Sequence, residues 1–201
     1  VTAPNNYSVT VTNEDNGCSA TSPAIAITED KTIPSASITS LETALTCTRS
    51  SIQLTATTDA TNASYLWITT ETTSAIDVTA PNNYSVTVTN EDNGCLATSP
   101  AITITEDKTV PSASITSLET VLTCARTSIE LTATTDATNA SYLWTTTETT
   151  PAIDVTAPNN YSVTVTNEDN GCFATSPAIT ITEDKTIPSA SITSLETVLT
   201  C

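Results

Sequence analysis

The chain has 201 residues, of which 22 are acidic and five basic, and its net charge is −17. Such a surface repels nucleic acid and anionic lipid, because both bind clustered lysine and arginine side chains. Histidine is absent, which excludes Ser-His-Asp and Cys-His catalysis, and the sequence has no glycine-rich phosphate-binding loop. We therefore expect neither an enzyme nor a nucleic-acid partner. No run approaches the roughly 18 apolar residues of a membrane span.

The sequence repeats itself with a period of 77 residues. The string VTAPNNYSVTVTNEDNGC begins at Val1, at Val78 and at Val155. This period is longer than one coil of a solenoid and suits a small sandwich domain. We expect an excerpt of a longer array, made of the C-terminal part of a repeat at 1–30, complete repeats at 34–107 and 111–184, and the N-terminal part of the next repeat at 188–201.

Within one period, apolar and polar residues alternate over short runs that turn-forming residues separate. Threonine is abundant, and Thr, Val, Ile and Tyr favour strands over helices. Six or seven short strands, with a turn signal about every 8–12 residues, predict an all-β sandwich. The expected strands of the first complete repeat are, in chain order, residues 36–45, 51–57, 64–68, 75–79, 84–89 and 101–105.

Two aromatic positions refine this prediction. Trp67 and its copy Trp144 lie in the third expected strand, and Tyr84 opens the penultimate one. Ig-type sandwiches bury a tryptophan on their third strand, although both residue types also favour strands in general. We predict an all-β chain of tandem Ig-like β-sandwich domains, about seven strands each, arranged end to end. Residues 108–111 are the expected linker, in which a proline blocks continued strand pairing.

The motifs LTC, SIELTAT, SYLW, VTAPNNYSVTVTNEDNGC and ITITEDKTxP recur through the period. Together they resemble the Ig-like or PKD-like repeats of giant bacterial surface adhesins, among them the SprB-like gliding-motility adhesins of Bacteroidetes. This resemblance implies a secreted, very long protein at the cell surface that contacts the substratum or other cells.

The expected function is mechanical: a structural stalk or filament segment that holds or forms an adhesive extracellular fibre. Its expected partners are neighbouring identical repeats, parallel copies of the chain, and an unknown surface or glycan ligand. An array of carbohydrate-binding modules is the alternative, but aromatic residues make up only 4% of the chain. Equivalent positions also vary, as in Ser19, Leu96 and Phe173. Ice or crystal-surface binding through threonine-rich faces is a minor alternative.

Acidic residues gather where the loops of one domain are expected to meet the next. Hard oxygen ligands of this kind suit Ca²⁺, with plain solvated acids as the competing interpretation. We expect no other cofactor. The candidate ligands of an interdomain calcium ion are Glu106, Asp107, Asp136, Glu168 and Asp169.

The six cysteines recur as two per repeat, without the CxxC pairs or histidines of a zinc site. Their number and spacing favour an oxidising, extracellular setting. Three regular pairings are open: Cys47 with Cys95 inside a domain, Cys18 with Cys47 across a linker, and Cys47 with Cys172 between successive domains.

A disulfide needs Cα atoms within about 7 Å. Cys47 precedes the second expected strand and Cys95 follows the fifth. These two positions lie at opposite ends of an Ig-like sandwich. Cys47 with Cys172 is therefore the first choice, and Cys95 and Cys124 would then pair with neighbouring domains. A modified strand order would allow the bond from Cys47 to Cys95, and reduced thiols are the third possibility.

Overall fold

The computed structural model describes residues 3–193 and 198. They contain strands and turns but no helix. The chain divides into two compact units, of which the first contains Val1–Leu45 and Ser51–Glu106. The second contains Thr46–Ser50 and Asp107–Cys201. The five residues Thr46–Ser50 thus belong to the second unit, although the residues on either side of them belong to the first.

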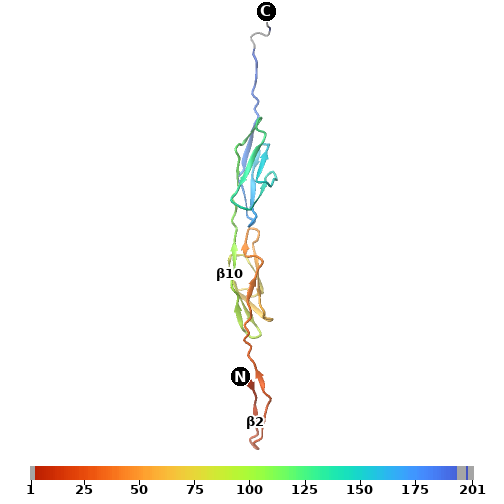
Figure 1. Ribbon diagram of the computed structural model, residues 1–201, viewed down its shortest axis with the longest axis vertical. Helices are drawn as coiled ribbons and strands as arrows, with labels where there is room; N and C mark the ends of the chain where they lie inside the picture. Colours follow the sequence, from red (N-terminus) through yellow and green to blue (C-terminus); the bar gives the residue numbers. More distant parts are fainter. Residues whose placement is uncertain (1–2, 194–197, 199–201) are drawn as a thin grey trace. The chain divides into compact units, whose positions relative to one another are not determined.

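The first complete repeat is a two-layered β-sandwich (Figure 1). One layer has the strand order β5-β7-β9. The other layer combines the sheets β10-β13-β6 and β12-β11-β8. These two sheets continue each other, because β10 is followed along the chain by β11, and β12 by β13. The strands are β5 (Ser37–Thr39), β6 (Ala44–Leu45), β7 (Ile52–Thr57), β8 (Ala63–Trp67), β9 (Ala75–Val78), β10 (Asn82–Tyr84), β11 (Val86–Asn90), β12 (Leu96–Thr98) and β13 (Ile102–Glu106).

This order is the Ig-like arrangement that the sequence predicts, with three refinements. The expected strand at residues 84–89 is divided into β10, which pairs with β13, and β11, which pairs with β8 and β12. The expected first strand, residues 36–45, is broken into β5 and β6, because its two halves pair in different layers: β5 with β7, and β6 parallel to β13. The expected last strand is likewise preceded by β12, which the sequence analysis missed. The further strand that Ig-type domains place between their third and fourth strands here is not formed: the described residues 68–74, between β8 and β9, contain no strand.

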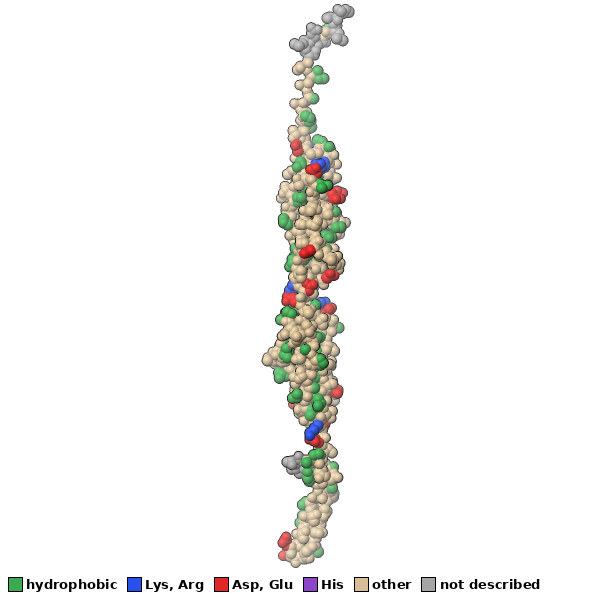
Figure 2. All heavy atoms as spheres, turned by 60° about the vertical axis from the view of Figure 1, so that its left-hand side comes forward, with side chains coloured by type: hydrophobic (Ala, Val, Ile, Leu, Met, Phe, Trp, Pro, Cys, Tyr) green, Lys and Arg blue, Asp and Glu red, His purple; other side chains and the backbone are tan. Residues whose placement is uncertain are grey.

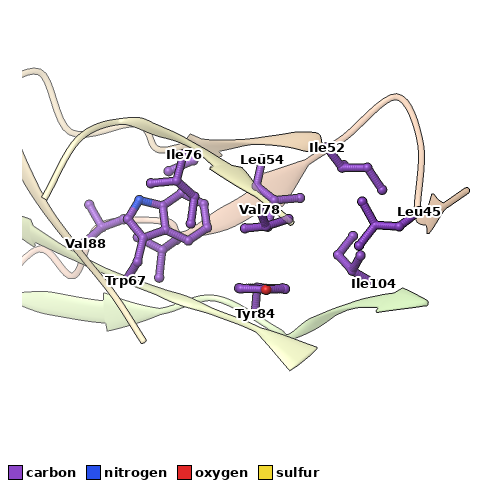
Figure 3. Packing of buried hydrophobic residues seen from close by; sticks show 11 residues of the cluster. Leu45, Ile52, Leu54, Trp67, Ile76, Val78, Tyr84, Val88 and Ile104 are labelled. Carbon is purple, nitrogen blue, oxygen red and sulfur yellow. The ribbon is translucent and has the colours of Figure 1, made fainter. Parts of the chain in front are cut away.

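The core lies between the two layers and takes alternate residues from the facing strands. Ile52, Leu54 and Ala56 of β7 are buried, as the period of two in a strand requires. Trp67 and Ile76 pack in the same cluster (Figure 3). Burial of apolar side chains contributes about 25 cal/mol per Å² removed from water, so this cluster is the main source of the sandwich's stability.

The buried aromatic residues also satisfy their polar atoms. Trp67 donates its Nε1 hydrogen to the carbonyl oxygen of Thr73 at 2.8 Å. The Tyr84 hydroxyl donates to the carbonyl oxygen of Ala80 at 2.9 Å. Both bonds tie a core side chain to a connecting loop.

The second complete repeat has the same strand order and an equivalent core around Trp144. Its strands are β14 (Ser114–Thr116), β15 (Val121–Thr123), β16 (Ile129–Thr134), β17 (Ala140–Trp144), β18 (Ala152–Val155), β19 (Asn159–Tyr161), β20 (Val163–Asn167), β21 (Phe173–Thr175) and β22 (Ile179–Asp184).

The N-terminal residues form a double hairpin that corresponds to the last strands of a repeat. Its strands are β1 (Asn5–Tyr7), β2 (Thr10–Thr12), β3 (Ser19–Thr21) and β4 (Ile25–Ile27). β1 pairs with β4 and β2 with β3. The expected partial repeat at 188–201 lies partly outside the described residues, and no strand is assigned to its described part.

Charged side chains are sparse on the face that Figure 2 presents, which is covered mostly by uncharged polar side chains and backbone. The described residues include no helix with the length and apolar character needed to cross a lipid bilayer.

Candidate functional site

The feature with the most specific chemistry is a contact between a loop and a turn, closed by a disulfide. The loop is Thr46–Ser50, which connects β6 to β7. It is bent tightly, because the Thr46 amide donates to the carbonyl oxygen of Arg49 at 3.0 Å. The Arg49 amide donates in turn to Thr46 Oγ1 at 3.1 Å. These two bonds leave Cys47 and Thr48 at the tip of the loop.

The turn connects β20 to β21 and carries the sequence Asn167-Glu-Asp-Asn-Gly-Cys172. Asn167 organises it, since the carbonyl oxygen of Asn167 accepts the Gly171 amide at 2.7 Å and the Asn167 amide donates to the carbonyl oxygen of Cys172 at 2.8 Å. Asn170 accepts the Cys172 amide on its side-chain oxygen at 2.9 Å. Gly171 has a φ of +69°, a left-handed conformation that glycine adopts without steric cost.

Loop and turn are joined by a disulfide and by a backbone hydrogen bond. Cys47 and Cys172 form a disulfide with Cα atoms 5.1 Å apart. The Cys47 amide donates to the carbonyl oxygen of Asn170 at 3.1 Å. Thr48 lies directly against Gly171, where a Cβ atom would come within 2.9 Å of Thr48 Oγ1. The absence of a side chain at Gly171 therefore allows the loop to approach the turn.

A third segment joins the same contact. Asn170 donates both of its amide hydrogens, one to Asp107 Oδ1 and one to the carbonyl oxygen of Thr109, each at 3.0 Å. Asp107 also accepts the Thr109 amide at 3.1 Å. This backbone hydrogen bond and the one from Asn170 hold the pKa of Asp107 below its ordinary value of 3.8.

The preceding repeat provides an internal comparison. Its turn at residues 90–95 makes the same internal bonds, including Gly94 to Asn90 at 2.7 Å. Asn93 donates to the carbonyl oxygen of Thr32 at 3.0 Å, as Asn170 does to Thr109. No cysteine loop lies on this turn in the described residues, and Cys95 is half-buried, whereas Cys172 is 1% exposed. The approach of the loop accounts for this burial.

Of the three pairings considered from the sequence, the structure contains the one whose partners are 125 residues apart. Neither Cys18 nor Cys95 is bonded to Cys47. Cys18, Cys95 and Cys124 carry free thiols, and Cys201 lies outside the described residues. The sequence did not lead to a prediction for three residues that shape the contact, Asn170, Gly171 and Thr48. The recurrence of Asn-Gly-Cys in every repeat is the signal that could have identified Asn170 and Gly171.

The five acids considered for calcium are not gathered into one site. No group of three or more carboxylates or thiols within reach of a metal ion occurs among the described residues. The structure brings Asp107 to the turn that contains Glu168 and Asp169, but its partner there is the amide of Asn170. Each of the others also has an interaction of its own. Asp136 accepts the Ser112 amide, Asp169 the Asn139 side chain, and Glu168 the Ser141 hydroxyl.

A surface hollow lies beside the loop that follows β14. It has a volume of about 270 Å³, and Leu118, Glu119 and Arg126 are among its lining residues. Arg126 forms an ion pair with Glu119 at 2.8 Å. The charge of Arg126 is therefore paired within the hollow.

The chain matches no known protein-family profile, and comparison with curated proteins finds no relative. Among solved structures, it is similar to the three N-terminal domains of the bacteriophage RB49 highly immunogenic outer capsid protein, with 21% identity and a TM-score of 0.43. That match covers 75% of this chain and 59% of the phage chain. It is also similar to immunoglobulin domains 1–5 of Sidekick-1, with 11% identity and a TM-score of 0.32, over 90% of this chain and 46% of the other. The chain thus spans about half the length of these tandem Ig-like proteins.

Proposed function

We propose that this chain is a load-bearing segment of a long extracellular stalk or filament, in which disulfides carry tension past the folded sandwiches. The role is mechanical and needs no catalysis. It fits a cell-surface adhesin of the kind that the sequence motifs resemble, including the SprB-like gliding-motility adhesins, with the chain holding or forming an adhesive fibre.

The observation that carries this proposal is the bond between Cys47 and Cys172. Tension applied to the two ends of a chain follows the shortest covalent path. That path crosses the disulfide and omits the residues between the two cysteines, whose separation is 125. Strands β7 to β20 all lie inside the omitted stretch. Both sandwiches can therefore unfold in part without the chain lengthening by the length of those strands.

The spacing of the cysteines supports the same role in a longer array. Cys124 occupies in the second repeat the place of Cys47 in the first, and it lies inside the loop that Cys47 and Cys172 close. If the same pairing recurs every period, successive covalent loops overlap. Tension would then pass from bond to bond through short segments such as residues 172–201, which limits how far the array can extend.

The surface and the chemistry of the bond support an extracellular setting. Disulfides persist in oxidising compartments, and a net charge of −17 keeps copies of the chain apart in solution. The threonine hydroxyls of neighbouring strands bond to each other, as in Thr87 with Thr98 at 3.0 Å. These pairs add cross-strand stability to sheets whose outer faces meet water.

Glycan binding is supported less well. A sugar-binding array needs an aromatic platform repeated in each domain, because sugar rings stack on aromatic faces. Phe173 is exposed, but Leu96 and Ser19 stand at the equivalent positions. The side chains of Trp67 and Trp144 are in the cores.

Pulling single molecules by handles at the two ends tests the proposal. With the disulfide intact, complete unfolding should release only the chain outside the bond. Reduction should add the 125-residue stretch, which at about 3.3–3.6 Å per residue is roughly 400 Å of extra length. A chain with Cys47→Ser and Cys172→Ser should show the long extension without reductant.

The matched control is Cys124→Ser, which removes a thiol that is unpaired in the structure. It should leave the extension of the oxidised chain unchanged. An oxidised chain that extends as far as the reduced one would show that the bond carries no load and would overturn the proposed role.

A further inference from the structure

The turn that carries Cys172 contains an Asn-Gly pair, Asn170-Gly171, which has a chemistry of its own. In an Asn-Gly pair the backbone nitrogen reaches the side-chain carbonyl carbon with little hindrance, because glycine has no Cβ atom. The Gly171 nitrogen then bonds to Cγ of Asn170 and gives up its proton, and the side-chain amide leaves as ammonia. Water opens the cyclic imide to aspartate or isoaspartate. This deamidation needs water but no oxidant or reductant.

The folded turn opposes each part of this reaction. The Gly171 amide donates to the carbonyl oxygen of Asn167 at 2.7 Å, so its nitrogen is held away from the side chain of Asn170. That side chain donates two hydrogen bonds to residues 107–109, each at 3.0 Å, and accepts the Cys172 amide at 2.9 Å. Asn170 is also only 1% exposed, which leaves little access for water.

Part of this protection comes from the loop that the disulfide holds in place. The Cys47 amide donates to the carbonyl oxygen of Asn170 at 3.1 Å. This oxygen and the Gly171 nitrogen belong to one planar peptide unit, which the loop and the turn therefore hold from both sides. Thr48 covers the same unit, because it lies directly against Gly171. Cyclisation requires this peptide unit to rotate, and the loop prevents that rotation.

The turn at residues 90–95 is a reference within the same chain. Its Gly94 amide donates to the carbonyl oxygen of Asn90 at 2.7 Å, and Asn93 accepts the Cys95 amide at 2.9 Å. No cysteine loop of the described part of the chain lies on this turn, since nothing is within 4 Å of the place a Cβ of Gly94 would occupy. Asn93-Gly94 therefore reports how fast the same turn reacts without the loop.

We infer that Asn170-Gly171 is a deamidation site that the disulfide between Cys47 and Cys172 keeps closed and that a thiol reductant opens. Reduction converts the two cysteines to thiols, while the reductant is oxidised to its own disulfide. The loop can then leave the turn, and the peptide unit between Asn170 and Gly171 gains the freedom to cyclise. The inference does not depend on the proposed mechanical role, because it concerns the chemistry of the turn and not the path of tension.

Deamidation would also make the opening lasting. A carboxylate at position 170 has no hydrogens to donate, so both bonds that Asn170 makes to Asp107 and Thr109 would be lost. The new carboxylate would face that of Asp107 in place of an amide, and like charges at this separation repel. The turn would fit the loop less well, and the disulfide would re-form less favourably.

Peptide mapping of the full chain tests the gating. Tryptic peptides 50–108 and 127–185 each contain one Asn-Gly pair, so mass spectrometry follows Asn93 and Asn170 separately during incubation in mildly alkaline buffer. In the oxidised chain Asn170 should react at least roughly tenfold more slowly than Asn93, as expected for a site that reacts only on local opening. In Cys47→Ser the rate at Asn170 should rise towards that of Asn93.

Asn93 is also the control for general unfolding, since its rate should be the same in both chains. Cys124→Ser, which removes a thiol that is unpaired in the structure, should leave both rates unchanged. Equal rates at Asn93 and Asn170 in the oxidised chain would overturn the inference. So would a rate at Asn170 that is the same in Cys47→Ser as in the parent, or an increase at Asn93 as large as the one at Asn170.

The lasting effect is tested with Asn170→Asp, which has the aspartate product at the site. In mixtures of oxidised and reduced dithiothreitol, the equilibrium constant for the bond between Cys47 and Cys172 should fall by roughly tenfold, because a hydrogen bond to a charged group is lost. Asn93→Asp should leave it unchanged. Asn170→Asp with Asp107→Asn exchanges the amide and the carboxylate and should recover most of the loss. An unchanged equilibrium in Asn170→Asp would show that deamidation does not hold the contact open.

Discussion

Gly171 lies so close to Thr48 that a methyl group on the glycine would come within 2.9 Å of the threonine Oγ1. Gly94, at the equivalent position of the preceding repeat, has nothing within 4 Å of the place a Cβ would occupy. The φ angles of the two glycines are +69° and +72°. Both glycines therefore have a left-handed backbone conformation, but only Gly171 lies against the loop that carries Cys47 and Thr48.

Alanine substitutions at these two glycines therefore distinguish the cost of backbone strain from the cost of contact with the loop. Gly94→Ala should lower the free energy of unfolding by about 1–2 kcal/mol, the cost of a left-handed conformation in an L-residue. Gly171→Ala should carry the same cost plus about 1–3 kcal/mol, because Thr48 must move. Urea denaturation of the two variants, followed by tryptophan fluorescence, measures the difference.

The double variant Gly171→Ala with Thr48→Ala provides the control. Alanine stands naturally at the equivalent position, Ala125, so the loop tolerates it. Most of the extra cost of Gly171→Ala should disappear in this background. Equal costs for Gly94→Ala and Gly171→Ala in the parent chain would mean that Thr48 does not press on the turn in solution.

The disulfide should contribute substantially to stability because it closes a long loop. Cys47 and Cys172 are 125 residues apart, and chain-entropy arguments give about 4–5 kcal/mol for a loop of this size, with about 2–4 kcal/mol typical of measurement. Reduction should therefore lower the urea midpoint. Cys47→Ser should lower it equally, and reductant should have no further effect on that variant.

Trypsin provides a direct map of the pairing. The five basic residues, Lys31, Arg49, Lys108, Arg126 and Lys185, divide the chain into six peptides with one cysteine each. Without reductant, peptide 32–49 should be linked to peptide 127–185. A link from 32–49 to 50–108 would instead show that Cys47 pairs with Cys95, contrary to the structure.

Much of the sandwich could be predicted from sequence because alternation reports burial directly. Ile52, Leu54 and Ala56 are two residues apart and all face the core. The break between β5 and β6 was not predictable in this way, since it depends on which neighbour each half finds. β12 was missed because it has only three residues, Leu96–Thr98, which is too short a run to show an alternation of apolar and polar side chains.

The partner of Cys47 and the partners of the acidic residues also differ in how far the sequence predicts them. Strand order alone places Cys47 and Cys95 at opposite ends of a sandwich, so topology was enough to favour another partner for Cys47. A carboxylate, by contrast, accepts hydrogen bonds from whichever donors lie nearest in the fold. The sequence does not show which amide groups those are. Asp107 is bonded to Asn170 and Thr109, groups that the pattern of acids does not reveal.

The turn after the tryptophan strand contains a strained residue in each repeat. Thr70 and Thr147 have φ angles of 79° and 78°, a conformation that is unfavourable for a β-branched side chain. The Thr70 amide donates to the carbonyl oxygen of Trp67 at 2.9 Å, which fixes the turn. Thr70→Gly should therefore raise the free energy of unfolding by about 1 kcal/mol, the relief of strain less the greater entropy of unfolded glycine.

Thr70→Val serves as the comparison, because it keeps the branched shape and the strain. It should give no gain in the urea midpoint, while Thr147→Gly should reproduce the gain in the second repeat. Equal midpoints for the valine and glycine variants would indicate that the left-handed turn costs nothing in this sandwich.

The last prediction concerns acid. Asp136 accepts the Ser112 amide at 2.7 Å, and this backbone bond, followed by the Ser112 side chain, lowers the pKa of Asp136 below 3.8. Asp59 has the same arrangement with Ser35 in the first complete repeat. A carboxyl whose pKa is lower in the folded state stabilises the fold above its unfolded pKa, near 3.9, and loses that contribution as the pH falls through the folded value.

Stability should accordingly be level from pH 7 to about pH 5 and decline below about pH 4 as these carboxyls become protonated. Asp136→Asn keeps an oxygen acceptor for Ser112 but removes the charge, so it should cost stability at pH 7 and show a shallower decline in acid. Asp154→Asn is a suitable control, since it makes the same change at an exposed position of β18. Urea midpoints at pH 7, 5, 4 and 3 measure both curves. If Asp136→Asn and the parent chain declined in parallel below pH 4, the Ser112 bond would not be the source of the acid sensitivity.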